Sequence, residues 1–531
     1  MTKLYRGLKI GGCAAPDGKQ FITLAKSGPT FVIPRDALFL NPDAEFKRLM
    51  TEGFAVTGRG QAAQILEDAT SVSDFPEREV LQDPGWSGSL FARPDGLVLA
   101  PSRTKKLGKE PIAGFHRHPS RYRCTGGRKK WASEVAGLVA DDDFAVFAAG
   151  LALAPAIRPL LSQPTMPLAI ELISDRNSQS FKRFTLSVTG TMGEDLVTDP
   201  MKDLVAEPAR YIGNSHDSLL IVGEANGYLC GAADKKRVTA VRSLVFDHLL
   251  AQEGGETNVS GGQAPSFVLI EKRSMNEMLE LDGEAAERLG EVLLTICIPP
   301  LDHDGECAGE RLSRSSERSW SEAARKATNY HGKALKSFQE GLVEWRSKDG
   351  FEAVQLSLDK QFNKFVAKAR KMAAKFDPNN ALVHPFALIA TSLWVAKRLE
   401  ILPFEKSKDS VLRVLGSYLG TRPEPVTAAS TLKELASRPD VLFIDDIDDS
   451  HSRKVLEAAP AFIKNKPGGI RELWILTDQK KTVFDWSVFS KLPDFPKWFC
   501  GKGEKDRHGS KRVIGAWKGA RVLRFRLPED E

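Results

Sequence analysis

The spacing of apolar residues predicts strands and helices that alternate through the middle of the chain. Short apolar runs bounded by Gly, Pro, Asp or Ser predict buried strands at 167–173, 218–222, 266–270 and 292–298. Apolar residues at helical spacing predict helices at 130–140, 143–153 and 181–188. Because strands that alternate with helices build layered sheets, this part of the sequence predicts an α/β core.

The two flanks have different patterns. Before the core, β-prone runs at 20–25 and 30–34, a helical segment at 43–52 and an Arg93-Pro94-Asp95-Gly96 turn within a hairpin predict a small α+β domain. After the core, helical spacing at 320–338, 351–376 and 382–399 predicts a helical subdomain.

The C-terminal part alternates again. The pattern predicts helix at 409–419, strand at 441–444, helix at 452–463, strand at 472–476, a short helix at 486–492 and β-prone pieces at 512–516 and 521–527. Its end resembles a winged helix, in which the last two pieces form a hairpin. The predicted domains are 1–132, 133–312, 313–405 and 406–531.

Composition narrows the class of protein. The 531 residues are 42% hydrophobic and 27% charged, which is close to globular averages and excludes a fibrous or mainly disordered chain. The most apolar window, 144–157, is too short to span a bilayer, and the N-terminus does not read as a secretory signal. The six cysteines include no CxxC pair, so we expect reduced thiols in a cytoplasmic protein without a membrane span.

Positive charge is concentrated in two windows. Residues 102–132 contain ten Lys or Arg and one acid, and residues 500–527 contain nine Lys or Arg and two acids. Aromatic residues are interleaved with these cations, a pattern typical of nucleic-acid binding, with DNA preferred to RNA. Two solvated basic loops are the alternative. The predicted nucleic-acid contacts are Arg121, Arg123, Arg128, Lys129, Lys130, Lys511, Arg512, Lys518, Arg521 and Arg524.

Short catalytic motifs are missing from the sequence. No Gly-Lys pair is followed by Ser or Thr, and there is no His-Glu-x-x-His, Gly-x-Ser-x-Gly or Gly-x-Gly-x-x-Gly. His116, His118 and Cys124 lack an evident fourth ligand, so a surface histidine pair is favoured over a metal site. We therefore predict no metal and no cofactor.

An ordered set of weak motifs runs through residues 6–405. It comprises Gly85-Trp86 followed by Phe91 and Pro-Asp-Gly, Tyr122–Gly126 leading to Trp131, an apolar helix ending at Pro159-Leu160-Leu161, Thr191-Met192-Gly193, Leu219–Glu224, Tyr330-His331-Gly332, and Phe386–Ala390. In order and spacing this set resembles the domain-of-unknown-function 927 family, helicase-like ATPases of phages and mobile elements. The resemblance implies a P-loop or AAA-like core between the N-terminal α+β domain and the helical subdomain, and the predicted fold is completed by the winged-helix-like end beyond residue 405.

The chain departs from that family at its nucleotide motifs. Where the family has a Gly-rich loop ending in Gly-Lys-Thr-Thr, residues 174–183 contain no glycine. Gly223 stands where the family has a magnesium-binding Asp, and the next strand ends in Glu271 instead of a hydroxyl. Lys182 and Glu224 are the remnants of the site. The resemblance thus implies a degenerate ATPase fold.

Three functions remain open from the sequence. The first is a DNA-binding, non-hydrolysing subunit of a phage-related, defence or mobile-element complex, with a partner protein or as a homo-oligomer. The second is a metal-dependent nuclease, because the apolar run at 441–444 leads into Asp445, Asp446 and Asp448. The third is an adaptor whose basic windows bind an acidic protein.

Overall fold

The structure is a computed structural model of the 531-residue chain. It describes residues 8–25, 30–51, 54, 59–105, 110–115, 124–162, 168–173, 199–208, 217–223, 228–229, 235–249, 266–271, 273–279, 281, 289–290, 293–297, 317–374, 382–421, 428–438, 440–443, 461–465, 470–476, 489, 495–503 and 522–527. The chain divides into two compact units, Met1–Arg422 and Pro423–Glu531. Within the residues just given, no helix has both the length and the apolar character needed to cross a membrane.

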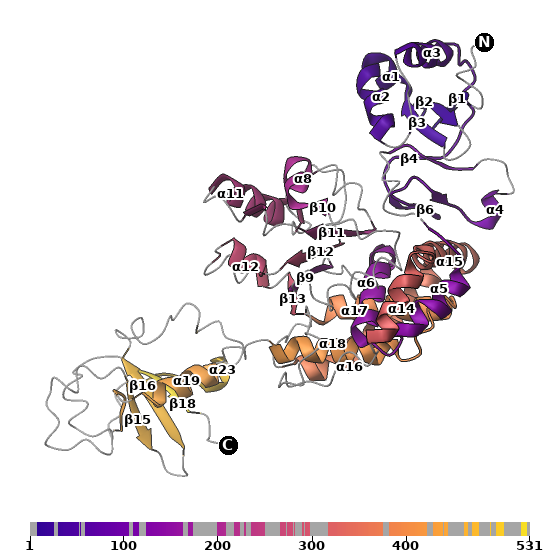
Figure 1. Ribbon diagram of the computed structural model, residues 1–531. Helices are drawn as coiled ribbons and strands as arrows, with labels where there is room; N and C mark the ends of the chain where they lie inside the picture. Colours follow the sequence, from indigo (N-terminus) through magenta and orange to yellow (C-terminus); the bar gives the residue numbers. More distant parts are fainter. Residues whose placement is uncertain are drawn as a thin grey trace. The chain divides into compact units, whose positions relative to one another are not determined.

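The first unit begins with a small antiparallel sheet covered by three helices (Figure 1). Its strands are β1 (Lys9–Ala14), β2 (Gln20–Ala25) and β3 (Thr30–Pro34), and its helices are α1 (Arg35–Leu40), α2 (Pro42–Thr51) and α3 (Arg59–Thr70). Apolar residues of β2 and β3, such as Ile22 and Ile33, form one core with Leu38, Leu49 and Ile65 of the helices. The predicted strands at 20–25 and 30–34 and the helix at 43–52 are confirmed.

Short strands follow this sheet. β4 (Val80–Leu81) pairs in parallel with β8 (Ile112–Ala113), and β5 (Gly85–Ser87), β6 (Leu90–Ala92) and β7 (Val98–Leu99) form an antiparallel sheet ahead of the one-turn helix α4 (Ser102–Lys105). The predicted hairpin about Arg93–Gly96 is confirmed. Gly96 has a φ of +81°, a conformation that glycine adopts without strain.

A five-stranded parallel sheet forms the centre of the first unit. Its strands are β9 (Ala169–Ile173), β10 (Asp199–Pro200), β11 (Leu219–Gly223), β12 (Ser266–Glu271) and β13 (Leu294–Cys297). They lie in the order β10-β11-β12-β9-β13 (Figure 1). All four strands predicted for the core are present. The first strand in sequence, β9, therefore lies inside the sheet, between β12 and β13.

Both faces of the parallel sheet are buried. Alternate residues of β11 point to opposite cores, with Leu220 and Val222 on one side and Leu219 and Ile221 on the other. The Leu220 side is covered by α8 (Met201–Ala206), α11 (Lys235–Ser243), the π-helix η5 (Leu244–Leu249) and α12 (Met275–Met278). The strands read as continuous apolar runs because neither face meets water.

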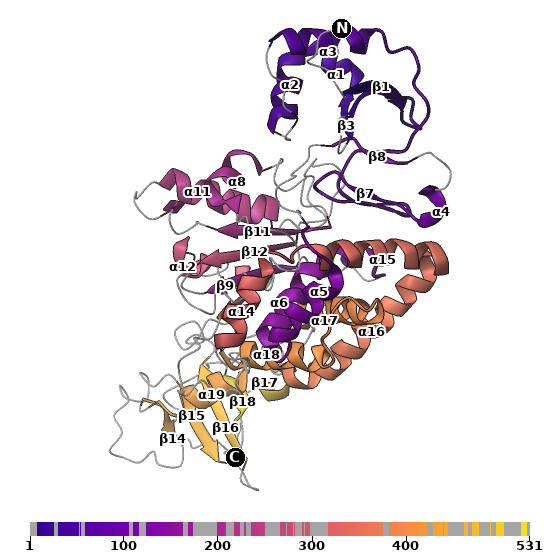
Figure 2. The same cartoon turned by 45° about the vertical axis from the view of Figure 1, so that its right-hand side comes forward.

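A helical layer covers the other face. It contains α5 (Arg128–Glu134), the 3₁₀ helices η2 (Ala136–Val139), η3 (Ala154–Ala156) and η4 (Arg158–Leu160), α6 (Asp143–Leu153), α14 (Glu317–Ala327), α15 (Lys333–Asp349), α16 (Phe351–Ala373), α17 (Val383–Arg398) and α18 (Ser407–Thr421). Figure 2 shows α6 within this layer, near α17 and α18. We predicted α18 within the C-terminal domain, whereas it packs in the first unit.

Helix α6 is buried along its whole length. Asp142 caps its start by accepting a hydrogen bond from the backbone N–H of Ala145 at 2.8 Å. Asp143, the first helical residue, is buried and accepts from Nη2 of Arg413 in α18 at 2.6 Å. A buried carboxylate needs such a partner, since an unpaired charge is costly away from water.

The predicted single helix at 320–338 is wrong. The structure has two helices, α14 and α15, separated by residues 328–332. Thr125 and His331 form a β-bridge there, with N···O distances of 3.0 and 3.2 Å. Gly332 has a φ of +70°, which allows the chain to turn into α15. Helical spacing of apolar residues on both sides concealed the break.

The second unit is a mixed five-stranded sheet with flanking helices. Its elements are α19 (Ala428–Ala436), β14 (Leu442–Phe443), β15 (Ala461–Asn465), β16 (Arg471–Leu476), α23 (Phe495–Trp498), β17 (Phe499–Gly503) and β18 (Val522–Arg526). The strand order is β14-β15-β16-β18-β17. The predicted strands at 441–444 and 472–476 are confirmed, but the predicted helix at 452–463 is wrong at its end, where β15 begins at Ala461.

The predicted wing is wrong in its pairing. β18 is bonded on one side to β16 and on the other to β17, so both of its edges are occupied. Leu523 and Phe525 belong to the core of the second unit. The apolar alternation of β18 therefore reflects an interior strand of the sheet, and residues 512–516, its predicted partner, lie outside the described residues.

Candidate functional site

The edge of the parallel sheet where β9 and β11 end is the position predicted for the nucleotide site. In open α/β sheets, ligands bind beyond the carboxyl ends of the strands, where the strand order reverses. Here that reversal involves β9, which lies between β12 and β13. Gly223 ends β11 and pairs with Ile270. The remnants Lys182 and Glu224 both lie outside the described residues.

A buried carboxylate that we did not predict lies in the middle of the same sheet. Glu171 of β9 is 1% exposed, and it accepts hydrogen bonds from the backbone N–H of Met275 and, at 3.0 Å, from the hydroxyl of Thr295. Its two oxygens thereby link β9 to the start of α12 and to β13. Because both of its oxygens accept hydrogen bonds from the protein, the Glu171 carboxylate has a structural role and holds three segments together.

Three cations of the first basic window, Arg128, Lys129 and Lys130, lie together on α5, and we call them the basic corner. Lys129 and Lys130 are exposed, and Arg128 is half-buried. Nζ of Lys130 lies 5.8 Å from the ring centroid of Tyr330. The N-cap, Gly127, leaves the first turn of α5 without a side-chain cap. The predicted residues Arg121 and Arg123 lie outside the described residues.

An ion pair holds this corner against α14. Lys326 donates a hydrogen bond to Glu134, the last residue of α5. The bond to Lys326 lowers the pKa of the Glu134 carboxyl, and the same bond to Glu134 raises the pKa of Lys326. Glu134 is thus matched to Lys326, which leaves Lys129 and Lys130 to carry the positive potential of α5.

The C-terminal cations predicted to bind DNA are not brought together by the described residues. Lys511, Arg512, Lys518 and Arg521 lie outside them, whereas Arg524 is a half-buried residue of β18. Arg524 lies opposite Trp474 in the register of the sheet. Arg524 is therefore placed within the sheet of the second unit, and the exposed hairpin position predicted for it is wrong.

The structure does not test the two metal sites considered from the sequence, because most of their residues are not described. His116, His118, Asp445, Asp446 and Asp448 are all absent from the described residues. Within the part that is described, no cluster of three or more His, Cys, Asp or Glu side chains could hold a metal ion.

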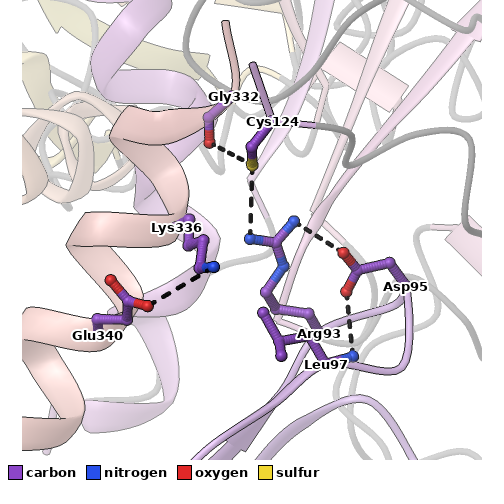
Figure 3. Close-up of polar contacts among 7 residues, drawn as sticks. All are labelled: Arg93, Asp95, Leu97, Cys124, Gly332, Lys336 and Glu340. Atoms are coloured by element: carbon purple, nitrogen blue, oxygen red, sulfur yellow. Dashed lines mark hydrogen bonds and ion pairs between the residues drawn. The ribbon is translucent and has the colours of Figure 1, made fainter. Parts of the chain in front are cut away.

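Three of the sequence motifs meet at one junction in the first unit. Arg93, before the Pro-Asp-Gly turn, is 1% exposed, and its Nη2 lies 3.0 Å from a carboxylate oxygen of Asp95. Figure 3 shows the Arg93 guanidinium between Asp95 and the thiol of Cys124, with a 4.0 Å contact to the sulfur. The Cys124 thiol donates to the carbonyl of Gly332 at 3.2 Å. The turn, the 122–126 motif and the 330–332 motif are thus joined.

Gly126 shows how closely two of these motifs pack. Its φ is +72°, and a Cβ atom there would lie 2.3 Å from the Tyr330 ring and 2.6 Å from the carbonyl oxygen of Asn329. His331 is buried, and its Nδ1 donates to the carbonyl of Ala327 at 3.0 Å. The junction requires glycine at position 126 because no side chain fits between the two segments.

The Gly85-Trp86 motif packs at a second contact in the same unit. The backbone N–H of Trp86 donates to Asp217 at 2.9 Å, and its indole N–H donates to the carbonyl of Ala156 at 2.8 Å. The Arg346 guanidinium lies 5.1 Å from the Trp86 ring centroid. Trp86 thus links the small β5–β7 sheet to the turn before β11 and to α15. These motifs are packing contacts, whereas the exposed lysines of the basic corner are able to bind an anionic ligand.

The comparisons with known proteins concern the fold. No protein-family model matches the chain, and no curated protein matches it. Among solved structures, the chain is similar to SCCmec type IV Cch, described as an active helicase, with a TM-score of 0.58 and 12% sequence identity. The similarity covers 98% of this chain and 93% of that one. At this identity it establishes the fold alone: the chain has a helicase-like α/β fold.

Proposed function

We propose that this chain is a DNA-binding protein that uses a helicase-like fold without hydrolysing ATP, as a subunit of a phage-related, defence or mobile-element assembly. One observation carries the proposal. The segment that follows the interior strand β9 is where such a fold would bind phosphates, and its sequence has neither a Gly-Lys-Ser/Thr nor any glycine in 174–183.

The replacement of the magnesium ligand supports the same proposal. Gly223 ends β11, the strand whose carboxyl end would supply an Asp to the metal. Without that carboxylate, a magnesium ion would lack its usual protein ligand at this strand. The phosphates would then lack the ion that usually neutralises their charge. The chain would then keep the helicase-like architecture for binding while the chemical step is lost.

Binding to DNA is supported by the basic corner. Phosphate contacts from Lys and Arg supply most of the affinity of sequence-independent DNA binding. Lys129 and Lys130 are exposed on α5, and the adjacent acid, Glu134, is already paired with Lys326. We expect backbone contacts that position the DNA without reading its sequence.

The absence of ATP turnover is testable directly. We expect no saturable binding of a fluorescent ATP analogue at micromolar concentration with magnesium, and no phosphate release above a buffer blank. The Glu224→Gln variant distinguishes residual ATP hydrolysis by this chain from hydrolysis by a contaminating ATPase. Steady phosphate release by the wild-type chain that disappears in this variant would overturn the proposal.

The DNA-binding half of the proposal is tested with a triple variant, Arg128→Ala, Lys129→Ala and Lys130→Ala. For a duplex, the slope of log affinity against log salt should flatten by up to about 0.9 per lost phosphate contact. The matched control removes three scattered exposed lysines instead, Lys9, Lys202 and Lys348. Equal salt slopes for the wild type and the triple variant would contradict a role of the corner in DNA binding.

A further inference from the structure

Helix α16 carries a row of lysines that the sequence analysis did not single out. From Lys360 to Ala373 it contains Lys360, Lys364, Lys368, Arg370 and Lys371 and no acid. All five cationic side chains are exposed. Net charge summed over a long window does not reveal them, because the acidic residues on either side lower that sum. The lysines follow one another at steps of four, four and three residues, and this spacing would have indicated one charged helix face.

Helix geometry places the four lysines on one face. At about 100° per residue, Lys360, Lys364, Lys368 and Lys371 fall within an arc of roughly 80° and extend over about 16 Å of the helix. Phe362, Phe365 and Ala369 on the opposite side are buried in the core of the first unit. The lysine face is therefore held in place by the packing of the other side of the same helix.

The acidic residues next to the lysines have specific partners, and within the described part of the chain they leave most of the positive charge of the lysine face unpaired. Asp359 accepts a hydrogen bond from the backbone N–H of Ser162 at 3.1 Å. Asp409 of α18 pairs with Lys368 at a distance of 2.9 Å. Among the described residues, no ion pair involves Lys360, Lys364 or Lys371.

A fifth lysine adds to the same surface. Lys408, next to Asp409, is exposed at the start of α18. Its pKa is lowered by burial of part of the side chain and by repulsion from Lys368 and Lys364. These ammonium groups are thus close enough to repel one another, which is a concentration of positive charge that a polyanion would relieve.

We propose that this lysine face, comprising Lys360, Lys364, Lys368 and Lys371 of α16 with Lys408 of α18, is a second binding surface for the phosphodiester backbone of DNA. It rests on the proposed function, because it assigns a further contact to the same ligand. A row about 16 Å long corresponds to roughly five nucleotides of each strand of a duplex, at 3.4 Å per nucleotide. The ammonium group of lysine is a compact charge on a flexible side chain. Such groups suit contacts with phosphates, because these contacts require no recognition of bases.

The test is a triple variant, Lys360→Gln, Lys364→Gln and Lys371→Gln, which leaves the Lys368 ion pair with Asp409 intact. Gln is a good helix former, so the thermal unfolding midpoint should stay unchanged. Binding to a labelled 30-base-pair duplex, measured by fluorescence anisotropy across a salt series, should lose about two to three units of salt slope. At about 0.1 M salt the affinity should fall roughly tenfold or more.

Two controls make the result specific. Lys360→Arg, Lys364→Arg and Lys371→Arg preserve the charge and should retain wild-type binding. Lys9→Gln, Lys202→Gln and Lys348→Gln change the net charge equally but lie elsewhere, and they should cost little affinity. An α16 variant that binds like this scattered control, or that loses binding equally in the arginine version, overturns the lysine face as a phosphate-binding surface.

The basic corner distinguishes failure of this inference from failure of the proposed function. If the corner variant loses affinity and the α16 variant does not, the protein binds DNA and the lysine face does not contribute. If the wild-type chain binds no DNA at low salt, both proposals are wrong. Retained DNA binding together with loss of an acidic protein partner in the α16 variant would assign the face to that protein and overturn its assignment to DNA.

Discussion

The Arg93 junction and the lysine face of α16 use positive charge in opposite ways. Arg93 is 1% exposed, and its guanidinium lies between Asp95 and Cys124. Lys360, Lys364 and Lys371 are exposed, and the described residues offer them no ion pair. The buried cation is part of the fold, whereas the exposed cations add little to stability and are available to a ligand. The recognisable motifs thus mark packing contacts, and the charge that we propose for DNA binding on α16 lies where the sequence has no named motif.

The largest effect should come from removing the buried cation. Arg93→Met leaves the Asp95 carboxylate without its partner, and we expect a loss of about 3 kcal/mol in the free energy of unfolding. Urea unfolding of the full chain, followed by tryptophan fluorescence, measures it. Arg103→Met, at an exposed position, should stay within about 0.5 kcal/mol. Equal midpoints for the two variants would mean that the junction does not stabilise the protein.

A smaller loss is expected at Gly126. Alanine there would need a positive φ and would place its Cβ against Tyr330 and Asn329, so Gly126→Ala should destabilise the protein by about 2 kcal/mol. Gly127 is the matched control, because its φ is −106° and a Cβ added there would have no atom within 4 Å. If Gly127→Ala costs as much, helix capping and not the close approach to Tyr330 is responsible.

At the lysine face, one substitution should change stability and DNA binding in opposite directions. Asp409→Asn removes the ion pair with Lys368, which costs less than about 1 kcal/mol because both side chains are half exposed. The same change removes a negative charge from the surface and should tighten DNA binding several-fold at low salt. Parallel measurements of unfolding and anisotropy test this, and weaker DNA binding by Asp409→Asn would contradict the proposed surface.

The smallest expected effect is a pH dependence at Lys408. Its lowered pKa means that the folded chain releases this proton before the unfolded chain does. Stability should therefore rise slightly as the pH approaches the ordinary lysine value near 10.5, while DNA binding weakens as the charge disappears. Lys408→Arg keeps the charge at this position, so it should abolish the rise in stability and reduce the loss of DNA binding that sets in before the other lysines of the face titrate. A parallel change in stability and binding would contradict this account.

Much of the fold could be predicted because both faces of the central strands are apolar. Runs such as Leu219–Gly223 and Ser266–Glu271 leave few alternatives to a buried strand. The errors arose where a distant segment determines local structure. The break at His331 depends on Thr125, and the partners of β18 are β16 and β17, which spacing alone does not specify.

The candidate site was less predictable than the fold. Arg128, Lys129 and Lys130 were found from charge density and lie together on α5. Glu171 was missed because a single acid within an apolar run carries no motif, and its role depends on Met275 and Thr295, more than 100 residues away. The proposed lysine face was missed because charge was counted by window and not by helix face.

The complete burial of α6 has a consequence for the synthesis of the protein. Helix α6 ends at Leu153, but α17 and α18, which cover it, end only at Arg398 and Thr421. At about 5–20 residues per second, a ribosome needs roughly 15–50 s to make the intervening chain. During that interval this eleven-residue apolar helix lacks α17 and α18, the two helices with which it makes most of its contacts. Translation of the first unit is therefore the stage at which we expect chaperone dependence and aggregation to be greatest.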